Sequence, residues 1–555
     1  MMRSTSVLAL AVLLAPPARA QSAAASPAPC ACAAAITTSA FDADLRFLSS
    51  DLLEGRAPAT RGGQITSQYL ATQLQIAGVQ PGVNGSYFQS VPIDVVGAIA
   101  STMSVRASGK ATAQLTYPSE VVIGPGSATE SSAAHGELVF VGYGAQAPEY
   151  KWDDFKGEDL HGKVLLVLVN DPPATAAEPA LFGGKAMTYY GRWTYKYEEG
   201  ERLGAAAVLI VHTTEAASYP WHTVVGSWAT AQRMLPRDPK LPAPLGARGW
   251  ITDSAATALL AQAGLSLSDL RAQADTRAFK PVHTGIQIDI AFKNTVAHLQ
   301  SENVVGLVPG SDAKLKQQYV VYSAHWDHLG IGPAVNGDSI YNGAADNASG
   351  TAGLLAIARA SAKMAPTRRS QLFVFVTAEE AGLLGSEWFA EHPTAPAKQL
   401  VANLNMDVLP LEGRVNDLDV IGVNKSTLGP MLAHFAKTKG LRISPETHPE
   451  AGHFYRSDHF SFAKAGVPAL SIGGGTDYVG RPKGFGDSVA ADYVAHRYHQ
   501  PSDEYKPTFD LRGAIQIAKL VMDFGRAIAS SPQVPAWNAD AEFKAARDAT
   551  GGPGT

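Results

Sequence analysis

The stretch FVFVTAEEAGLLGSEWFAEH, from Phe373 to His392, contains one complete unit of the predicted fold. An apolar, β-like run ends at two adjacent glutamates, Glu379 and Glu380, and a turn of small residues leads into a helical segment. This order predicts a buried strand, a loop and a helix. Two neighbouring carboxylates at the end of a core strand are costly unless positive charge lies beside them. The stretch therefore predicts an α/β unit and raises the question of which cation accompanies the glutamates.

The same strand–loop–helix order repeats between about residues 295 and 530. Strand-like runs are QYVVYSAH, LVANLNMDV, DLDVIGV and VPALSIGG, and helical runs include GTAGLLAIARASAKM and LRGAIQIAKLVMDFGRAI. Such alternation predicts an α/β fold whose mixed sheet is mostly parallel and flanked by helices. We assign this domain to residues 271–530, with its N-terminal part in residues 37–135.

Residues 136–270 form a predicted separate module, β-rich and of the α/β type. The runs GELVFVGYGA, GKVLLVLVND and GAAAVLIVHT are typical of buried strands bounded by glycine or aspartate. The module contains no cluster of metal ligands and no nucleophile pattern. We therefore expect a structural insert, since chemistry resides in sites and not in folds.

The first twenty residues, MMRSTSVLALAVLLAPPARA, have the pattern of a secretory signal peptide. Arg3 supplies the positive charge, Val7 to Leu14 the apolar region, and ARA the cleavage pattern before Gln21. The apolar run is shorter than the ~18–20 residues that a membrane span needs. We expect an exported protein, periplasmic or secreted, with a disordered leader at 21–36 and a flexible C-terminal tail at 531–555.

Composition narrows the range of functions. Of the 555 residues, 46% are hydrophobic and 17% charged, the net charge is −5, and no long Lys/Arg run occurs. A nucleic-acid or membrane-inserted role is therefore disfavoured. The only cysteines, Cys30 and Cys32, lie in the leader. Thiol catalysis and Cys-ligated zinc are excluded from the domains, so any metal must be held by histidines and carboxylates.

Five potential metal ligands lie in loops or at strand ends: His325 in SAHWDHLG, Asp346 in YNGAADNASG, Glu380, Asp407 in NLNMDVLP and His499 in AHRYHQPSDEY. Alone, each motif has an ordinary interpretation, such as a surface histidine or an aspartate in a turn. Ligands of open α/β sheets bind at the carboxyl ends of the strands. We therefore expect the five side chains to lie together.

Two imidazoles and three carboxylates suit zinc, with manganese or cobalt as possible substitutes. Five ligands exceed one tetrahedral ion but fit two ions that share a carboxylate. The two dications would compensate the clustered negative charge. One glutamate of the pair would bind metal and the other would handle a proton. Asp327 could accept the second N–H of His325, because strand periodicity puts both side chains on one face.

The order H-x-D, D-N-A-S-G, E-E, N-x-D and Y-H-x-P-x-D closely resembles the co-catalytic di-zinc aminopeptidases. Their relatives include glutamate carboxypeptidase, transferrin receptor and glutaminyl cyclases. The resemblance covers residues 295–530, and FLSSDLLEGRAPATRGG resembles the helical segment that precedes this domain in the family. Residues 136–270 resemble the protease-associated (PA) domain that is often inserted in these enzymes.

The resemblance implies a role for each residue. His325 and Asp407 would hold one zinc, Glu380 and His499 the other, Asp346 would bridge them, Glu379 would be the general base and Asp327 would orient His325. It also implies a cis peptide bond between Asp346 and Asn347. Tyr455, beside the SDH motif, is the available phenol for the oxyanion, with a packed tyrosine as the alternative. Asp458 and His459 are interpreted as supporting or packing residues.

The predicted function is that of an exported zinc metallo-aminopeptidase that acts on peptides with a free N-terminus. Carboxypeptidase or glutaminyl cyclase chemistry on the same scaffold is the alternative. A carboxypeptidase would need cations such as Arg456, Arg481 or Lys483 to hold the substrate carboxylate. A non-catalytic receptor or binding module would be expected to have lost ligands, and here the whole set remains. The sequence leaves the preferred N-terminal residue and the oligomeric state open.

Overall fold

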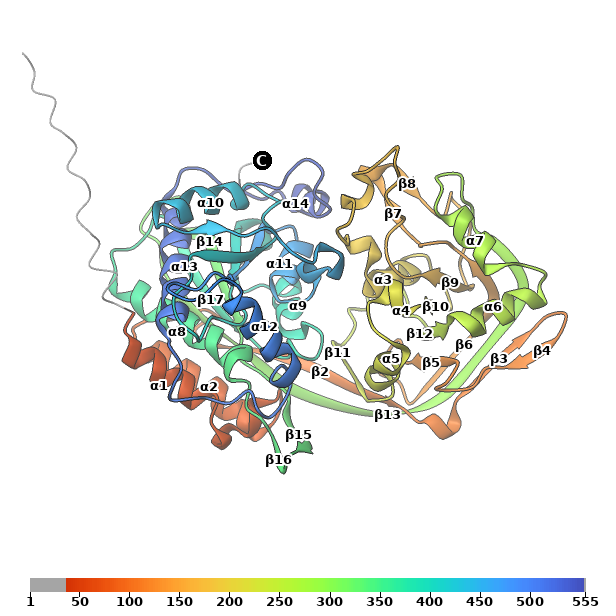
Figure 1. Ribbon diagram of the computed structural model, residues 1–555, viewed down its shortest axis with the longest axis horizontal. Coiled ribbons are helices and arrows are strands. Elements are labelled where there is room, and N and C mark those ends of the chain that lie inside the picture. Colours follow the sequence, from red (N-terminus) through yellow and green to blue (C-terminus); the bar gives the residue numbers. More distant parts are fainter. Residues whose placement is uncertain (1–35, 554–555) are drawn as a thin grey trace, which may run out of the picture.

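A computed structural model describes residues 36–553 and divides them into two lobes that lie side by side (Figure 1). The 27-residue strand β13 (Val282–Val308) runs along both lobes and contributes to the sheet of each. No helix within residues 36–553 is long and apolar enough to cross a membrane. The predicted signal peptide, Cys30 and Cys32 lie outside the described residues, as does all but the last residue of the predicted leader.

The first lobe is built on a mixed sheet whose main strands follow the order β2–β13–β17–β14–β18–β21–β19–β20. The bounds are β2 (Phe88–Ala98), β17 (Ser370–Val376), β14 (Tyr319–His325), β18 (Leu400–Asn405), β21 (Ala469–Gly474), β19 (Asp417–Ile421) and β20 (Arg442–Ile443). The short strands β1 (Gln80–Pro81) and β11 (Gln232–Met234) add to β13 and β2. The central strands β17, β14, β18 and β21 are parallel, which confirms the predicted α/β class.

Helices cover both faces of this sheet. One face packs on α1 (Thr38–Leu48), α2 (Arg61–Ile76), α8 (Gly350–Lys363), α10 (Leu428–Thr438) and α13 (Arg512–Ser530). The other face packs on α9 (Leu384–Glu391) and α11 (His459–Lys464). Along β14, Val320 and Tyr322 join the first core while Val321 joins the second, as the two-residue period of a strand requires. His325 is the last residue of this strand.

The second lobe has its own sheet, in the order β4–β3–β13–β6–β9–β10–β12–β5. The bounds are β4 (Thr112–Gln114), β3 (Ser104–Ser108), β6 (Ser131–Phe140), β9 (Val164–Leu168), β10 (Ala207–His212), β12 (Ala247–Thr252) and β5 (Val121–Gly124). Its helices are α3 (Trp193–Arg202), α4 (Thr214–Ala217), α5 (Trp221–Trp228), α6 (Asp253–Gln262) and α7 (Leu267–Ala274).

The second lobe is wider than the insert expected at residues 136–270. It includes β3, β4 and β5, which the sequence had assigned to the first domain. Val105 of β3 and Ile123 of β5 share a core with Leu138 of β6. The strand-like runs were recognisable, but β3 pairs with the N-terminal half of β13 and β5 pairs with β12, and such long-range pairing is not visible in a local pattern.

The C-terminal segment packs between the lobes instead of forming a free tail as far as residue 553. Trp537 and Phe543 are 6% and 5% exposed, and α14 (Lys544–Thr550) follows them. Phe543 lies in an aromatic core that includes Tyr189 of the second lobe and Phe460 of the first. Buried aromatic area explains the order of this segment. The remaining α-helices and β-strands are β7 (Gln146–Ala147), β8 (Trp152–Asp153), β15 (Gly330–Val335), β16 (Asp338–Tyr341) and α12 (Phe485–His496).

Candidate metal centre

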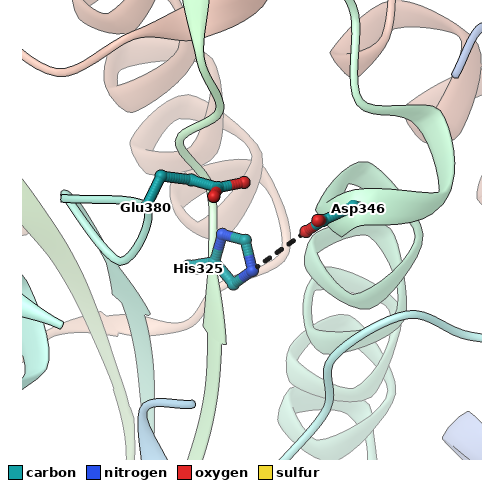
Figure 2. A group of neighbouring side chains, drawn as sticks. All are labelled: His325, Asp346 and Glu380. Atoms are coloured by element: carbon teal, nitrogen blue, oxygen red, sulfur yellow. Dashed lines mark ion pairs between the residues drawn. The ribbon is translucent and has the colours of Figure 1, made fainter. Parts of the chain in front are cut away.

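The five predicted ligands meet at the carboxyl end of the parallel strands. His325 is the last residue of β14, Glu380 follows β17 and Asp407 follows β18. Asp346 lies in the turn before α8, and His499 lies shortly after α12. Figure 2 shows the side chains of His325, Asp346 and Glu380 converging from two strand ends and the turn above the helix.

The two imidazoles each face two carboxylates. His325 Nε2 lies 3.4 Å from Asp346 Oδ1 and 3.2 Å from Asp407 Oδ1. His499 Nε2 lies 3.3 Å from Asp346 Oδ2 and 3.1 Å from Glu380 Oε2. Asp346 therefore presents one oxygen to each histidine. The five residues form two triplets that share one carboxylate.

The spacing of these atoms fits metal coordination. Zinc ligands at ~2.0–2.2 Å from a tetrahedral ion lie about 3.3–3.6 Å from one another. The observed nitrogen–oxygen distances run from 3.1 to 3.4 Å. The ligand atoms of His325, Asp346 and Glu380 also all lie within 4.8 Å of one another. The residues present are thus compatible with two ions.

The charges of the group call for cations. Burial acts to lower the pKa of His325, but Glu379, Asp407 and Asp346 outweigh it and raise that pKa well above its ordinary value. Burial also opposes protonation of His499, yet its hydrogen bonds to Asp346 and Glu380 raise its pKa to about 10. The carboxylates alone therefore draw protons onto both imidazoles. Metal ions can take the place of these protons.

Glu379 lies beside the same group. Its side chain, His325 and Asp407 offer ligand atoms within 4.8 Å of one another. Burial, followed by the charges of Asp458, Asp407 and Glu380, raises the pKa of Glu379 well above its ordinary value, against the opposing effect of His325. A carboxylate in this environment accepts a proton readily.

The geometry of Asp327 differs from the prediction. His325 Nδ1 lies 3.2 Å from the backbone oxygen of Asp327 but 3.9 Å from Oδ1. The side chain instead accepts the backbone N–H of Glu379 at 3.1 Å. The chain leaves the strand at His325, so strand periodicity no longer places Asp327. The carbonyl of Asp327 orients the imidazole, and its carboxylate holds the loop of Glu379.

His328 was missed by the sequence reasoning. Its Nδ1 lies 2.6 Å from Glu380 Oε1, and its side chain is fully buried. Gly343, with φ of +57°, lies so close that a Cβ there would be 2.6 Å from His328 Cδ2. The residue stands three positions after His325 in SAHWDHLG, but a histidine beyond a strand end carries no signal of its own.

Tyr455 is not brought into the site. Its buried hydroxyl donates to Glu542 Oε1 at 2.8 Å and accepts from Lys425 Nζ at 3.2 Å, and its ring packs in the aromatic core between the lobes. Its proton is thus committed to Glu542, a residue of the C-terminal segment whose packing the sequence did not reveal. The prediction of Tyr455 as oxyanion donor is wrong on these contacts.

Tyr498 is a phenol that lies beside the site. It is 45% exposed, and its ring stacks on His499 with 3.9 Å between centroids. Burial and then the charges of Asp346, Glu380 and Glu379 raise its pKa, so the hydroxyl remains protonated. Its position next to His499 in the sequence was the available signal.

Strained backbone surrounds the ligands. Ala378, Val408 and His499 have φ of +55°, +56° and +57°. Left-handed conformations of residues other than glycine cost of order 1–3 kcal/mol and cluster at functional sites. They reverse the chain just before Glu379 and just after Asp407. The bond Asp346–Asn347 is cis, as predicted.

Two buried residues fix the Asp346 turn. Arg56 donates to the carbonyls of Trp326 and Gly343, both at 2.7 Å, and to that of Asp346 at 3.3 Å. Asp503 accepts the backbone N–H groups of Ala345 and Asp346 at 3.1 Å. Arg56 lies in the motif FLSSDLLEGRAPATRGG, which explains why that segment accompanies the domain.

Comparison with known proteins agrees with this site. Residues 303–525 match peptidase family M28. Leucine aminopeptidase 2 of Trichophyton equinum is 26% identical over 291 residues, which cover 49% of this chain and 54% of that protein. Aminopeptidase YwaD of Bacillus subtilis is 32% identical over 111 residues, 20% of this chain and 22% of that one. The chain therefore spans about half the length, or less, of these curated relatives.

Among solved structures, an aminopeptidase from Aneurinibacillus sp. strain AM-1 is similar, at 20% identity and a TM-score of 0.47, covering 90% of this chain and 96% of that chain. The family match spans β14, α8, β17, β18 and part of α13, and so includes every element that carries a predicted ligand. Residues 303–525, which contain all five predicted ligands, are thus similar to peptidase family M28.

Proposed function

We propose that the protein is an exported two-zinc metallo-aminopeptidase that removes N-terminal residues from peptides. The observation that carries the proposal is the pair of triplets in which each imidazole faces two carboxylates and Asp346 is shared. The family match and the similarity to a leucine aminopeptidase support it.

His325 and Asp407 would hold one ion, Glu380 and His499 the other, with Asp346 between them. When bound, such ions polarise a carbonyl and acidify a water molecule. Manganese or cobalt would be tolerated by the same nitrogen and oxygen ligands.

The chain's own residues supply the proton transfers and the positioning. Glu379 takes a proton from the attacking water and returns it to the leaving amine, as a general base and then a general acid. The carboxylate of Asp327 fixes the Glu379 backbone at 3.1 Å. Tyr498, which is 45% exposed and stacks on His499, would donate a hydrogen bond to the oxygen that becomes negative in the transition state.

Two parts of the proposal rest on sequence. Export follows from the pattern of the first twenty residues. Residues 136–270 of the second lobe would form a protease-associated domain that shapes access to the site from its side. Carboxypeptidase or glutaminyl cyclase chemistry remains the alternative on this scaffold. A receptor role is disfavoured because the full set of ligands and Glu379 is present.

The test is hydrolysis of a panel of aminoacyl-p-nitroanilides and their N-acetylated counterparts, before and after chelation. Metal content is measured with activity as zinc, manganese or cobalt is returned. We expect cleavage of free-amine substrates only, lost with the metal and restored by zinc at two ions per chain. Cleavage of acetylated substrates, or none with zinc bound, would favour the alternative chemistries. Absence of metal binding would disprove the five-ligand assignment.

A further inference from the structure

Two arginines at the junction of the lobes have no counter-ion among residues 36–553. Arg192, between the Tyr189–Gly191 turn and α3, has an Nε atom that is enclosed without a hydrogen-bond partner within these residues. Arg456, on the loop before α11, is exposed, and its guanidinium forms no ion pair or hydrogen bond with the described part of the chain. An enclosed N–H of a guanidinium that is left unpaired is costly unless a ligand provides the missing partner.

The segments that carry these arginines touch each other. Met187 N donates to the carbonyl of Pro449 at 3.0 Å, and the rings of Tyr189 and Tyr455 lie 5.9 Å apart. Burial and then the charge of Arg456 lower the pKa of Arg192 to about 10, so each guanidinium lies in the field of the other.

The surroundings do not neutralise the pair. His453 lies in the same field, because burial followed by Arg456, His448 and Arg192 lowers its pKa. The nearby acid Glu450 contacts His448, at 3.2 Å. The tyrosines around Arg192 are protonated at neutral pH and carry no charge. The acids at this junction already have partners: Glu542 pairs with Lys425 at 2.9 Å, and Asp171 accepts from Thr188 N at 2.8 Å. Neither arginine therefore has a carboxylate partner among the described residues.

This cluster adjoins the metal centre. Ser457, the residue after Arg456, donates to Asp407 Oδ2 at 2.8 Å and accepts from Asn405 Nδ2 at 3.0 Å. Each residue of an extended peptide spans ~3.3–3.6 Å. When the scissile bond of a peptide substrate lies beside Glu379, the residue that follows this bond therefore comes within reach of the loop that carries Arg456.

We propose that Arg192 and Arg456 bind a carboxylate carried by the substrate residue that follows the scissile bond. The carboxylate is the C-terminus of a dipeptide or an acidic side chain at that position. Two guanidiniums can hold it by bidentate hydrogen bonds. This inference rests on the proposed aminopeptidase function and makes the second lobe a contributor to substrate choice, through Arg192.

The other cations named from the sequence are placed differently. The Arg481 guanidinium lies 4.8 Å from the centre of the Phe485 ring, at the start of α12. Lys483 is exposed on the same segment. No contact of the described residues brings Arg481 or Lys483 together with a cation of the second lobe. Neither residue therefore belongs to a cluster of positive charge between the lobes.

The experiment compares kcat/KM of the zinc-loaded protein on Leu-Gly, Leu-Gly-amide, Leu-Asp-amide and Leu-p-nitroanilide. Arg456→Gln and Arg192→Gln should each lower the value for Leu-Gly or Leu-Asp-amide by about 10- to 100-fold. Values for Leu-Gly-amide and the nitroanilide should change by less than about twofold. Arg456→Lys, which keeps the positive charge but not the planar guanidinium that forms bidentate hydrogen bonds, should give an intermediate loss of kcat/KM. Arg106→Gln, at an exposed position of β3, is the matched control and should change nothing.

The comparison of the four substrates distinguishes the possible results. A loss confined to Leu-Gly assigns the site to the C-terminal carboxylate, and a loss confined to Leu-Asp-amide assigns it to an acidic side chain. Equal losses on all four substrates, or no loss on any, overturn the proposal. Turnover of the nitroanilide reports on the aminopeptidase function separately. Calorimetric binding of Leu-Gly and its amide to Glu379→Gln protein, with and without Arg456→Gln, makes the same comparison without turnover.

Discussion

His328 Nδ1 lies 2.6 Å from Glu380 Oε1, while Glu380 Oε2 lies 3.1 Å from His499 Nε2. Both oxygens of Glu380 are therefore held by imidazoles that come from different loops. Hydrogen bonds to both histidines lower the pKa of Glu380, against the opposing effects of burial and of Asp346. His328 fixes the orientation in which this carboxylate can meet a metal ion.

Replacing His328 should weaken metal binding without removing a proposed ligand. Substitution of a residue that orients a metal ligand typically costs 10–100-fold in metal affinity, and we expect a loss of about that size for His328→Gln. The measurement is competition for zinc with a chromophoric chelator. His298→Gln, at a side chain that is 74% exposed and paired with Asp94, is the control. Unchanged zinc affinity in His328→Gln would show that the contact with Glu380 is incidental.

Replacing Glu379 should separate metal binding from turnover. Glutamine keeps the shape of the side chain but cannot take the proton of the attacking water, so Glu379→Gln should lose nearly all activity. Metal analysis should still find two ions, because Glu379 is not among the five proposed ligands. Retained hydrolysis of aminoacyl-p-nitroanilides would exclude Glu379 as the general base.

The two tyrosines should behave differently when each loses its hydroxyl. Tyr498→Phe removes a donor at the site and should lower kcat by about 10²–10³-fold, the range seen for single oxyanion donors. Tyr455→Phe removes a hydrogen bond to Glu542 and should cost about 1 kcal/mol of stability with little change in kcat. Steady-state kinetics and thermal unfolding of both variants provide the comparison. A kcat loss in Tyr455→Phe equal to that in Tyr498→Phe would restore the assignment made from sequence.

The ligands were predictable because each ends a strand or a turn at the same edge of a sheet. His325, Asp346, Glu380, Asp407 and His499 lie within short motifs whose order along the chain carries the information. The α/β class followed from the alternation of apolar runs and helical periods. These are local signals, and the edge of a parallel sheet brings them together without further specification.

The residues that were missed depend on contacts between distant segments. Arg56 reaches the Asp346 turn across 290 positions of sequence, and Glu542 binds Tyr455 across 87. The pairing of β3 with β13 and of β5 with β12, which extends the second lobe beyond the expected insert, has the same origin. The left-handed backbone at Val408 contradicts the preference of a β-branched residue, and only the folded environment imposes it.

A pH dependence of stability should arise from His459, at the start of α11. The residue is fully buried, neither ring nitrogen has a hydrogen-bond partner in the described residues, and its ring packs on Phe454 at 4.9 Å. Burial and then the charge of Lys425 lower its pKa to about 3. In the unfolded chain a histidine titrates near ~6.5.

The direction in which stability changes with pH follows from proton linkage. Between pH ~6.5 and the folded pKa, the unfolded chain binds a proton that the folded protein does not, so this group removes stability as the pH falls, by up to ~1.4 kcal/mol per pH unit. Unfolding free energies of the wild type and of His459→Phe, measured in urea from pH 7 to 4, should therefore converge or cross as the pH falls. His222→Phe, at an exposed position of α5, should run parallel to the wild type. If the His459→Phe curve is also parallel to the wild type over this range, His459 is protonated in the folded protein and the burial argument fails.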